Sequence, residues 1–583
     1  MSSVPDRSDI DEEYKWDLDD LYPDDDAWEA AYEEAEDRIA DLRAFEGRAT
    51  DDADTLYETL ETHERAMRTV SNVSAYARLR RDEDTADDHY QALLARSESL
   101  RSEASSAASF IEPALQDAGR DTVEAFVAEH PDLETYEHYF DDVLRQKPHT
   151  RSTEVETLLA DLGEVLGSTG DVYDVLTNAD MEFTLNSFPT LQEHPDREFR
   201  REVYETFYDE WDEYRNTVAT AYRNSVKTDV KLTRARNYDT AREAALDGPN
   251  VPVEVYDTLV ETVTDNLDVL GRHADLKRRH VDADQLRMWD LYVPMVEGES
   301  PTVEYDRARE YVTDAVAPLG EAYRDHLAQG LDSRWVDVYE TPNKRSGAYS
   351  GGTYDSQPYI LLNYQDDVAS MYTLAHELGH SMHSELTSDA QPYVYSSYEI
   401  FVAEVASTVN ETLLTHHLLD VVEDDRLRRH VLNQYLERFR STLFRQTMFA
   451  QFEHRTHELA EDGEALTADR LDDIYRDLKA TYYPDADVDG RIAREWMRIP
   501  HFYRAFYVYQ YATGISAAVA LAESILEKGE PAARRYREFL SNGSRGYPLE
   551  LLEDAGVDMT SPDPVEAAID TYGEFVDEFE SLS

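Results

Sequence analysis

The chain has 583 residues, no cysteine and a formal net charge of −68, from 56 basic and 124 acidic residues. This composition excludes disulfide bonds and thiolate metal sites. It also argues against a nucleic-acid-binding protein or one that docks on an anionic membrane, because there is no basic surface to displace counterions. Hydrophobic residues make up 41% and aromatic residues 11%, which suits a large core and argues against a disordered acidic protein.

The acidic residues are spread along the whole chain, whereas lysine is scarce. A surface with this charge repels itself unless concentrated salt shortens the Debye length, to about 3 Å at 1 M. We therefore expect a halophilic protein from a salt-rich cytoplasm. The N-terminus lacks the basic start and apolar core of a signal peptide, and the longest apolar stretch, near Ile515–Leu521, is far shorter than a membrane span. We expect a cytoplasmic protein without membrane contact.

Helical periodicity dominates the first 232 residues. Apolar residues recur at three- and four-residue spacing in the segments Trp28–Phe45, Asp52–Arg81, Ala86–Ala107, Thr122–Glu129, Glu154–Leu166 and Asp196–Leu232. Met181–Leu185 alternates and predicts a short strand. We expect two domains, an N-terminal helical domain over residues 1–195 and a catalytic domain over residues 196–583.

The character of the sequence changes at Lys344–Gln365, which is rich in Gly, Tyr and Ser and ends in the β-prone run Pro358–Tyr364. This segment predicts a small sheet with Gly351 and Gly352 at a turn. From Asp367 onward the pattern is helical to the end of the chain. The sequence thus predicts a mainly α fold with a small sheet just before the next helix.

The next predicted helix, Val368–Glu385, contains the residues that we expect to be catalytic. His376 and His380 are four residues apart, so both imidazoles leave the same face of the helix and can hold one Zn²⁺. Glu377 lies beside His376 and can reach a water on the metal, which is the His-Glu-x-x-His pattern of metallopeptidases. At this composition the pattern arises by chance about 0.05 times per chain. The other interpretation is a core helix with two histidines and a surface glutamate.

A catalytic zinc site needs a third protein ligand and one open position. The metzincin pattern fails, because His383 and Leu386 stand where it requires Gly and His. Glu404, on the predicted helix Ser396–Leu414, is the best candidate, because a carboxylate among alanines and valines needs a cation. Glu411, seven residues on, either orients a ligand or is a solvated helix residue. We expect His383 to be packed or to support a ligand.

A third element is the aromatic segment Ile499–Gly514. Tyr503, Tyr507 and Tyr511 share one face of a helix there, and Phe502, Phe506 and Tyr509 share another. A tyrosine or histidine beside a zinc site can donate a hydrogen bond to an oxyanion. An aromatic stripe in the core would give the same pattern.

Several segments, in the same order along nearly the whole chain, resemble one family of peptidases. They are Lys15–Tyr22, Asp290–Pro294, Lys344–Tyr349, Ala375-His-Glu-Leu-Gly-His-Ser-Met-His383, Phe401-Val-Ala-Glu-Val-Ala-Ser-Thr408 and Ile499–Tyr511. Together they resemble oligoendopeptidase F in the thimet-oligopeptidase-like family. The resemblance implies a large helical bowl whose deep channel admits only short peptides, with the small sheet next to the zinc helix.

The resemblance also implies roles for individual residues. It implies one Zn²⁺ per chain on His376, His380 and Glu404, with Glu377 as the general base. It further implies that His501 and tyrosines of residues 503–511 stabilise the transition state, with Tyr509 as the first choice and Tyr503 and Tyr507 next. In such relatives the strand before the zinc helix pairs with the substrate backbone, and Ile360–Tyr364 occupies that place.

We therefore predict a zinc-dependent endopeptidase that hydrolyses internal bonds of short oligopeptides. One alternative is a metallocarboxypeptidase of similar fold, in which a cation such as Arg345 or Arg498 would hold the substrate carboxylate. Another is a non-catalytic peptide-binding protein, against which the intact Glu377 argues. The sequence leaves the oligomeric state open.

Overall fold

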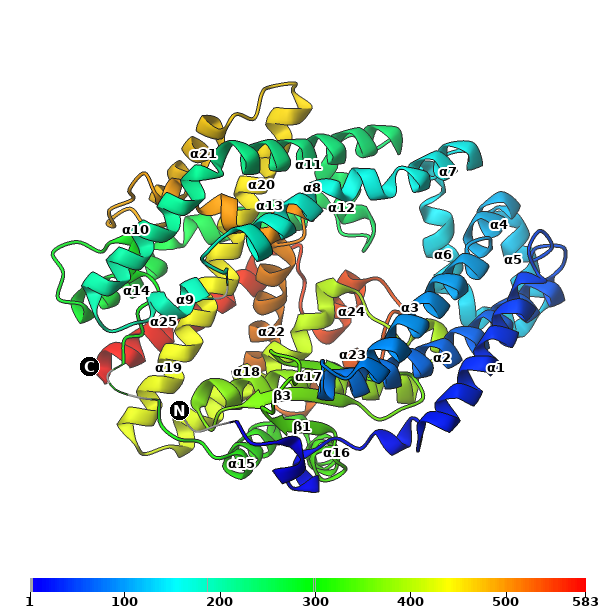
Figure 1. The fold of residues 1–583 in the computed structure, drawn as a ribbon, viewed down its shortest axis with the longest axis horizontal. Coiled ribbons are helices and arrows are strands. Elements are labelled where there is room, and N and C mark those ends of the chain that lie inside the picture. The colour runs from blue at the N-terminus through cyan, green and yellow to red at the C-terminus, as the bar shows by residue number, and fades with distance from the viewer. Residues whose placement is uncertain (1–3, 186, 297, 299, 583) are drawn as a thin grey trace. The chain divides into compact units, whose positions relative to one another are not determined.

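The computed structural model describes residues 4–185, 187–296, 298 and 300–582. The chain is drawn in Figure 1. It divides into two compact units, each built from three separate segments. The first unit contains residues up to 147, 302–417 and 524–555, and the second contains residues 148–301, 418–523 and those from 556 onward. The predicted boundary at residue 195 falls inside the second unit, and the division into domains 1–195 and 196–583 stays a prediction.

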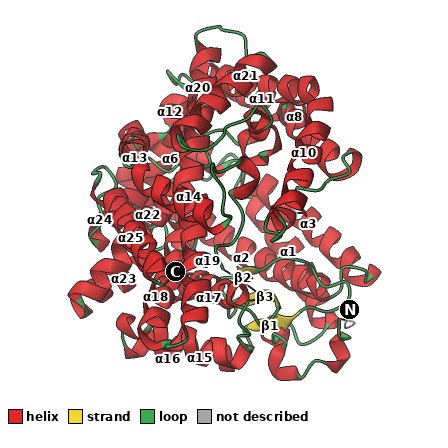
Figure 2. Cartoon of the chain, turned by 90° about the vertical axis from the view of Figure 1, so that its left-hand side faces the viewer, coloured by secondary structure: helices red, strands yellow, loops and turns green. Residues whose placement is uncertain are grey.

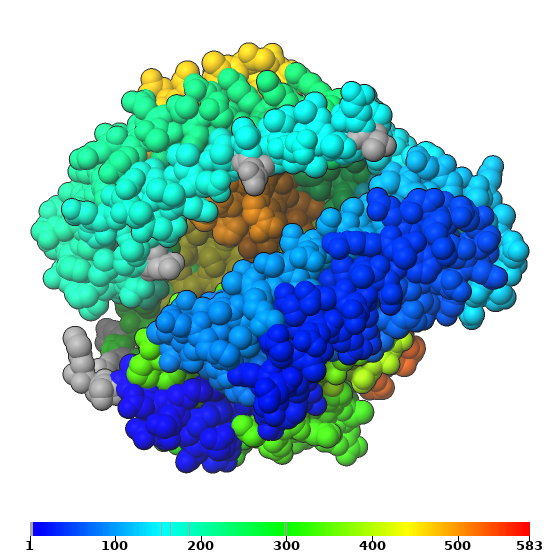
Figure 3. All heavy atoms as spheres, turned by 45° about the vertical axis from the view of Figure 1, so that its right-hand side comes forward, coloured from blue at the N-terminus to red at the C-terminus, as the bar shows by residue number. Residues whose placement is uncertain are grey.

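The first unit is largely helical. Its helices are α1 (Asp25–Arg43), α2 (Ala53–Glu83), α3 (Asp88–Ala108), α4 (Ile111–Ala118), α5 (Arg120–Glu129), α6 (Glu137–Arg145), α15 (Tyr305–Ala315), α16 (Glu321–Asp332), α17 (Val368–Ala390), most of α18 (Ile400–Val421), α23 (Glu530–Leu540) and α24 (Pro548–Ala555). Aspartates cap the first three: the side chains of Asp24, Asp52 and Asp87 each accept a backbone N–H of the first turn. Helices α1 to α3 share one hydrophobic core and form a continuous surface, blue in Figure 3.

Three short strands, yellow in Figure 2, form the predicted small sheet of this unit. They are β1 (Val336–Tyr339), β2 (Tyr349–Gly351) and β3 (Tyr359–Tyr364), in the order β1-β3-β2. Strand β3 pairs in parallel with β1 and antiparallel with β2, so both of its edges are occupied at Ile360 and Leu361. Strand β2 therefore lies at an edge of the sheet.

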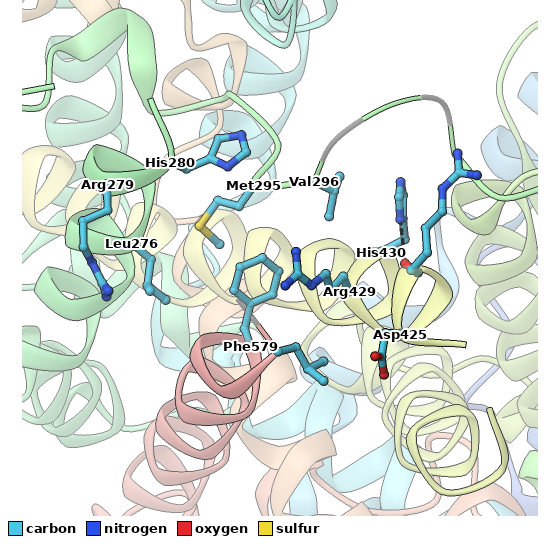
Figure 4. Close-up of a pocket in the computed structure, with 11 residues that line it drawn as sticks. Leu276, Arg279, His280, Met295, Val296, Asp425, Arg429, His430 and Phe579 are labelled. Atoms are coloured by element: carbon cyan, nitrogen blue, oxygen red, sulfur yellow. Dashed lines mark hydrogen bonds between the residues drawn. The ribbon is translucent and has the colours of Figure 1, made fainter. Parts of the chain in front are cut away.

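The second unit is also helical. Its helices are α7 (Thr153–Asp161), α8 (Gly163–Val175), α9 (Ser187–Gln192), α10 (Arg197–Glu213), α11 (Arg215–Ala235), α12 (Ala241–Asp247), α13 (Val253–Asp265), α14 (Leu267–His280), α19 (Asp425–Phe439), α20 (Arg445–Glu461), α21 (Ala468–Tyr482), most of α22 (Tyr509–Lys528) and α25 (Asp563–Ser581). A cavity of about 530 Å³ within this unit is lined by residues of α14, α19 and α25, among them Arg279, Arg429 and Phe579 (Figure 4).

The prediction of a mainly α fold with a small sheet is confirmed. The segment Asp196–Leu232, predicted to be helical, forms two helices, α10 and α11, which meet at Tyr214. One detail is wrong. The expected strand Met181–Leu185 does not form, because the carboxylate of Glu210 accepts the backbone N–H groups of residues 182 and 183 in place of a neighbouring strand.

The bowl and the channel implied by the resemblance stay predictions. Within the part of the chain that the structure describes, no helix is both long and apolar enough to cross a membrane.

Candidate active site

The helix predicted to carry the metal ligands is α17. It begins after Asp367, whose carboxylate accepts the backbone N–H of Ser370 at 2.8 Å, so an acidic side chain caps the positive end of the helix. One helical turn apart on this helix, the Nε2 atoms of His376 and His380 lie 3.2 Å from each other. The two imidazoles therefore converge on one point.

Glu404 of α18 completes a triangle of donor atoms. Its Oε2 lies 3.5 Å from Nε2 of His376 and 3.7 Å from Nε2 of His380. A tetrahedral Zn²⁺ with bonds of about 2.0–2.1 Å requires donor atoms about 3.3–3.4 Å apart. The residues thus fit zinc in both chemistry and spacing, and they form the one group of this kind among the described residues.

Glu411, two turns further along α18, supports the first histidine. Its side chain is fully buried, and its Oε1 lies 2.7 Å from Nδ1 of His376. A carboxylate here accepts the Nδ1–H group, which makes Nε2 of His376 the unprotonated nitrogen that can bind a metal. Of the two roles that the sequence left open for Glu411, the structure shows the supporting contact.

Glu377 lies next to this triangle and is 6% exposed. Burial raises the pKa of its carboxyl group to about 7, and the charge of Glu404 adds to this, whereas His376 and a hydrogen bond from the backbone N–H of Ser350 act in the opposite direction. A carboxyl group with a pKa near neutrality can accept and release a proton at the operating pH. These are the properties that a general base requires.

The hydrogen bond to Ser350 also places an edge of the sheet at the site, because Ser350 belongs to β2. The expectation that substrate pairs with Ile360–Tyr364 stays a prediction; β3 is the central strand, and its Ile360 and Leu361 already pair on both sides. The edge strand beside Glu377 is β2.

Helices α17 and α18 are in close contact at Gly379. A Cβ atom at this position would lie 2.6 Å from the carbonyl oxygen of Ala406 and 2.6 Å from Cα of Ser407. The side-chain amide of Asn410 donates to the carbonyl of Ala375 at 3.3 Å across the same contact. Gly379 thereby allows α18 to come close enough to bring Glu404 to the two histidines.

We predict that Gly379→Ala destabilises the protein by about 1–3 kcal/mol, the usual cost of forcing extra volume into a packed core, and weakens zinc binding because α18 must move away. Urea unfolding and a zinc titration measure the two effects. Gly167→Ala is the matched control, because a Cβ there meets no atom within 4 Å. Unchanged unfolding and zinc affinity in Gly379→Ala would contradict this role.

His383 is not among the residues that form the metal triangle. Its ring is 1% exposed and stacks on that of Tyr398, with centroids 3.7 Å apart and planes 6° apart. Burial lowers the pKa of His383 to about 3, so the ring is neutral. The expectation that His383 is a packed histidine agrees with this arrangement.

The aromatic segment of residues 501–511 lies in the second unit. The rings of His501 and Tyr507 are parallel, with centroids 6.0 Å apart, and the hydroxyl of Tyr511 lies 3.5 Å from Nε2 of His501. Burial, with Arg504 and Arg445 nearby, lowers the pKa of His501 and favours the neutral imidazole. The structure thus brings His501, Tyr507 and Tyr511 together.

The two other tyrosines proposed for catalysis are placed differently. Tyr509 is 1% exposed and packs against Tyr256, with ring centroids 5.3 Å apart. Tyr503 is half-buried and packs against Tyr173 at 4.8 Å. The sequence placed Tyr507 and Tyr511 on one helix face and Tyr509 on another, but helical spacing alone does not show which face lies in the core. The catalytic roles of these tyrosines stay predictions.

Known proteins match this chain over almost its whole length. The sequence profile of peptidase family M3 matches residues 190–571, and a profile described as oligopeptidase F matches residues 115–183. Oligopeptidase PepF of Bacillus subtilis is 42% identical over 595 residues, with coverage of 100% of this chain and 89% of that protein. Group B oligopeptidase PepB of Streptococcus agalactiae is 38% identical over 590 residues, with coverage of 99% and 98%.

The fold comparison agrees with the sequence comparison. The crystal structure of oligoendopeptidase-F from Enterococcus faecium superimposes with a TM-score of 0.73 and 34% identity, with coverage of 96% of this chain and 99% of that one. The resemblance seen in the sequence is confirmed. The chain belongs to peptidase family M3 and is a metalloendopeptidase.

Proposed function

We propose that this protein is a zinc-dependent endopeptidase that hydrolyses internal bonds of short peptides in a salt-rich cytoplasm. The observation that carries the proposal is the triangle of His376, His380 and Glu404, with the buried carboxyl of Glu377 beside it. A Zn²⁺ held there would polarise the scissile carbonyl and acidify a water molecule.

The chain's own residues supply the proton transfers. Glu377 takes a proton from the attacking water, whose oxygen bonds to the carbonyl carbon. When the C–N bond breaks, the same carboxyl returns that proton to the leaving amine. We also propose that His501, with a tyrosine of residues 503–511, donates a hydrogen bond to the developing oxyanion. Tyr507 has the most direct support, because its partly exposed ring lies parallel to His501.

The substrate backbone has a matching surface in β2, whose outer edge faces Glu377 through the N–H of Ser350. An extended peptide can add to such an edge as a further strand, with hydrogen bonds from its main chain to that of β2. A folded protein cannot present this conformation without local unfolding. The preference for short, extended peptides therefore has a physical basis in the first unit itself.

The carboxypeptidase alternative has less support, because its two candidate arginines already have carboxylate partners. Arg498 is 7% exposed and bonds to Glu495 and to the hydroxyl of Tyr292, both at 2.7 Å. Arg345 lies 3.5 Å from the buried carboxylate of Asp82. Neither guanidinium is free of competing contacts for a substrate carboxylate.

A size series tests the proposal. With casein, a folded acidic protein and a ten-residue peptide at equal peptide-bond concentration, we expect rapid cleavage of the peptide, slower cleavage of the unstructured casein and none of the folded protein. Product masses over time measure the three rates. Rapid digestion of the folded protein would contradict the oligopeptidase proposal and leave the metallopeptidase assignment intact.

The charge of −68 predicts that the protein needs salt to fold. Raising KCl from about 0.1 M to about 1 M shortens the Debye length from about 10 Å to about 3 Å and removes most self-repulsion. We expect the melting temperature to rise over this range, and sucrose of equal osmolarity to raise it less, because sucrose does not screen charge. A melting temperature that stays constant up to about 3 M salt would contradict the halophilic interpretation.

A further inference from the structure

Phe506 has an unusual backbone conformation for an aromatic residue. Its φ angle is +54°, in the left-handed region that bulky side chains rarely adopt. The residue lies in the turn between the short helix Pro500–Tyr503 and α22. Strain of this kind persists only where the surroundings impose it, and such positions gather at functional sites. The contacts of Phe506 therefore show what imposes the turn.

The contact that fixes this backbone comes from Glu453 of α20. The N–H of Phe506 donates to Oε1 of Glu453 at 2.7 Å, and the Glu453 side chain is fully buried. Its other oxygen, Oε2, has no hydrogen-bond partner among the described residues. Burial raises the pKa of Glu453 well above its usual value, and the charge of Asp229 adds to this, so the neutral acid is favoured. A buried carboxyl with a single hydrogen bond is costly to keep, which calls for an explanation.

The turn joins the buried residue Phe506 to neighbouring residues whose aromatic rings are partly exposed. The Phe506 ring is 2% exposed and packs against His457, with centroids 4.7 Å apart. His501 precedes Phe506 in the chain and Tyr507 follows it. The rings of His501 and Tyr507 are parallel, and the ring of Tyr511 is perpendicular to both. The turn at Phe506 thus directly precedes the segment that carries Tyr507 and Tyr511.

We infer that Glu453 is a positioning residue, whose hydrogen bond to the Phe506 backbone holds the turn that sets the arrangement of His501, Tyr507 and Tyr511. The inference rests on the proposed role of His501 in the reaction, and it extends that role to a residue that need not touch substrate. What the turn requires of Glu453 is an acceptor oxygen at Oε1, not a negative charge.

Two variants of Glu453 that are similar in size distinguish a need for an acceptor oxygen from a need for a negative charge. Glu453→Gln keeps an oxygen that can accept the Phe506 N–H, whereas Glu453→Met fills the space without one. In the zinc-loaded full-length enzyme we expect Glu453→Met to lower kcat by roughly tenfold to a hundredfold, with KM within about twofold and the melting temperature little changed. Glu453→Gln should keep most of kcat. Equal kcat in Glu453→Met and the parent, or an equal loss in both variants, would overturn the inference.

A spectroscopic readout keeps the test independent of the role of His501. With ¹³C-labelled histidine, the signal of His501 among the 18 histidines is identified by its loss in His501→Gln. We expect this signal to move in Glu453→Met and to stay in place in Glu453→Gln. If His501→Gln keeps full kcat, the proposed catalytic role fails, whereas the movement of the signal still shows that Glu453 positions the ring. A signal that does not move in Glu453→Met overturns the inference.

A second pair of variants serves if Glu453→Met does not fold. Phe506→Ala removes the ring and keeps the N–H group, whereas Phe506→Pro removes the N–H group and holds φ near −65°. Both lose the same packing against His457, so the difference between them reports the backbone. We expect Phe506→Pro to have a kcat at least roughly tenfold below that of Phe506→Ala. Equal kcat values in the two variants would overturn the inference.

Discussion

Glu377→Gln should retain zinc and lose nearly all turnover. Glutamine keeps the shape of the side chain and leaves His376, His380 and Glu404 unchanged, so the metal triangle persists. It cannot accept the proton of the attacking water, and general-base catalysis contributes typically about 10²–10⁴-fold to the rate. We expect kcat to fall by that factor while metal analysis still finds one zinc per chain. Steady-state kinetics on a short fluorogenic peptide measures the loss.

The control lies on the same helix. Glu385 is the other glutamate of α17, and its carboxylate lies 3.5 Å from Nε2 of His326, so it has a partner outside the metal triangle. Glu385→Gln should keep turnover close to that of the parent. If Glu377→Gln instead retains both zinc and near-parent turnover, the base must be another residue and the proposed mechanism is wrong.

Glu404→Ala should abolish activity by a different route, through loss of the metal. With Glu404 removed, two imidazoles remain of the three protein ligands that a catalytic zinc site uses. The carboxylate of Glu404 would also balance the charge of an ion held by the two histidines, from which it lies 3.5 and 3.7 Å. We expect zinc content well below one per chain after dialysis, measured by atomic absorption, and activity that returns only partly at high zinc concentration.

Glu399→Ala provides the comparison, because Glu399 precedes the same helix and its side chain is exposed. This variant should hold zinc as the parent does. Full zinc retention in Glu404→Ala would remove Glu404 from the site and leave the third ligand to be found.

The proposed metal ligands were accessible to sequence reasoning because each has a local signal. His376 and His380 share a helix face by their spacing alone, and Glu404 is recognisable as a carboxylate in an apolar helix. The contact of Glu411 with His376 could be expected only as one of two outcomes, because a distance of seven residues shows that Glu404 and Glu411 share a face but not what that face meets. Which role Glu411 has depends on the close contact of α17 and α18 at Gly379, and this tertiary contact cannot be read from the sequence.

The features that the sequence did not predict also depend on tertiary contacts. The alternation of Met181–Leu185 is real, but Glu210 satisfies the backbone there and no strand partner is present. Conversely, Val336–Tyr339 also alternates, yet it was not predicted as a strand; its Asp337 is buried and paired with Lys344 at 2.7 Å. Which strand occupies the centre of the sheet cannot be read from one sequence, so the position of β2 at the edge beside Glu377 was not predicted. The left-handed turn at Phe506 has no sequence signal, because its cause, Glu453, lies 53 residues earlier.

The central claim, cleavage of internal peptide bonds, is tested most directly by product mass spectrometry on one substrate. The substrate is a ten-residue peptide that is acetylated at its N-terminus and amidated at its C-terminus, incubated with the zinc-loaded enzyme in molar KCl. An endopeptidase that binds the backbone along β2 needs neither terminus of the peptide. We therefore predict one internal cut that gives an N-terminal and a C-terminal fragment, whose masses sum to that of the peptide plus one water. An intact blocked peptide, together with release of single C-terminal residues from the unblocked one, would contradict the claim and favour a carboxypeptidase.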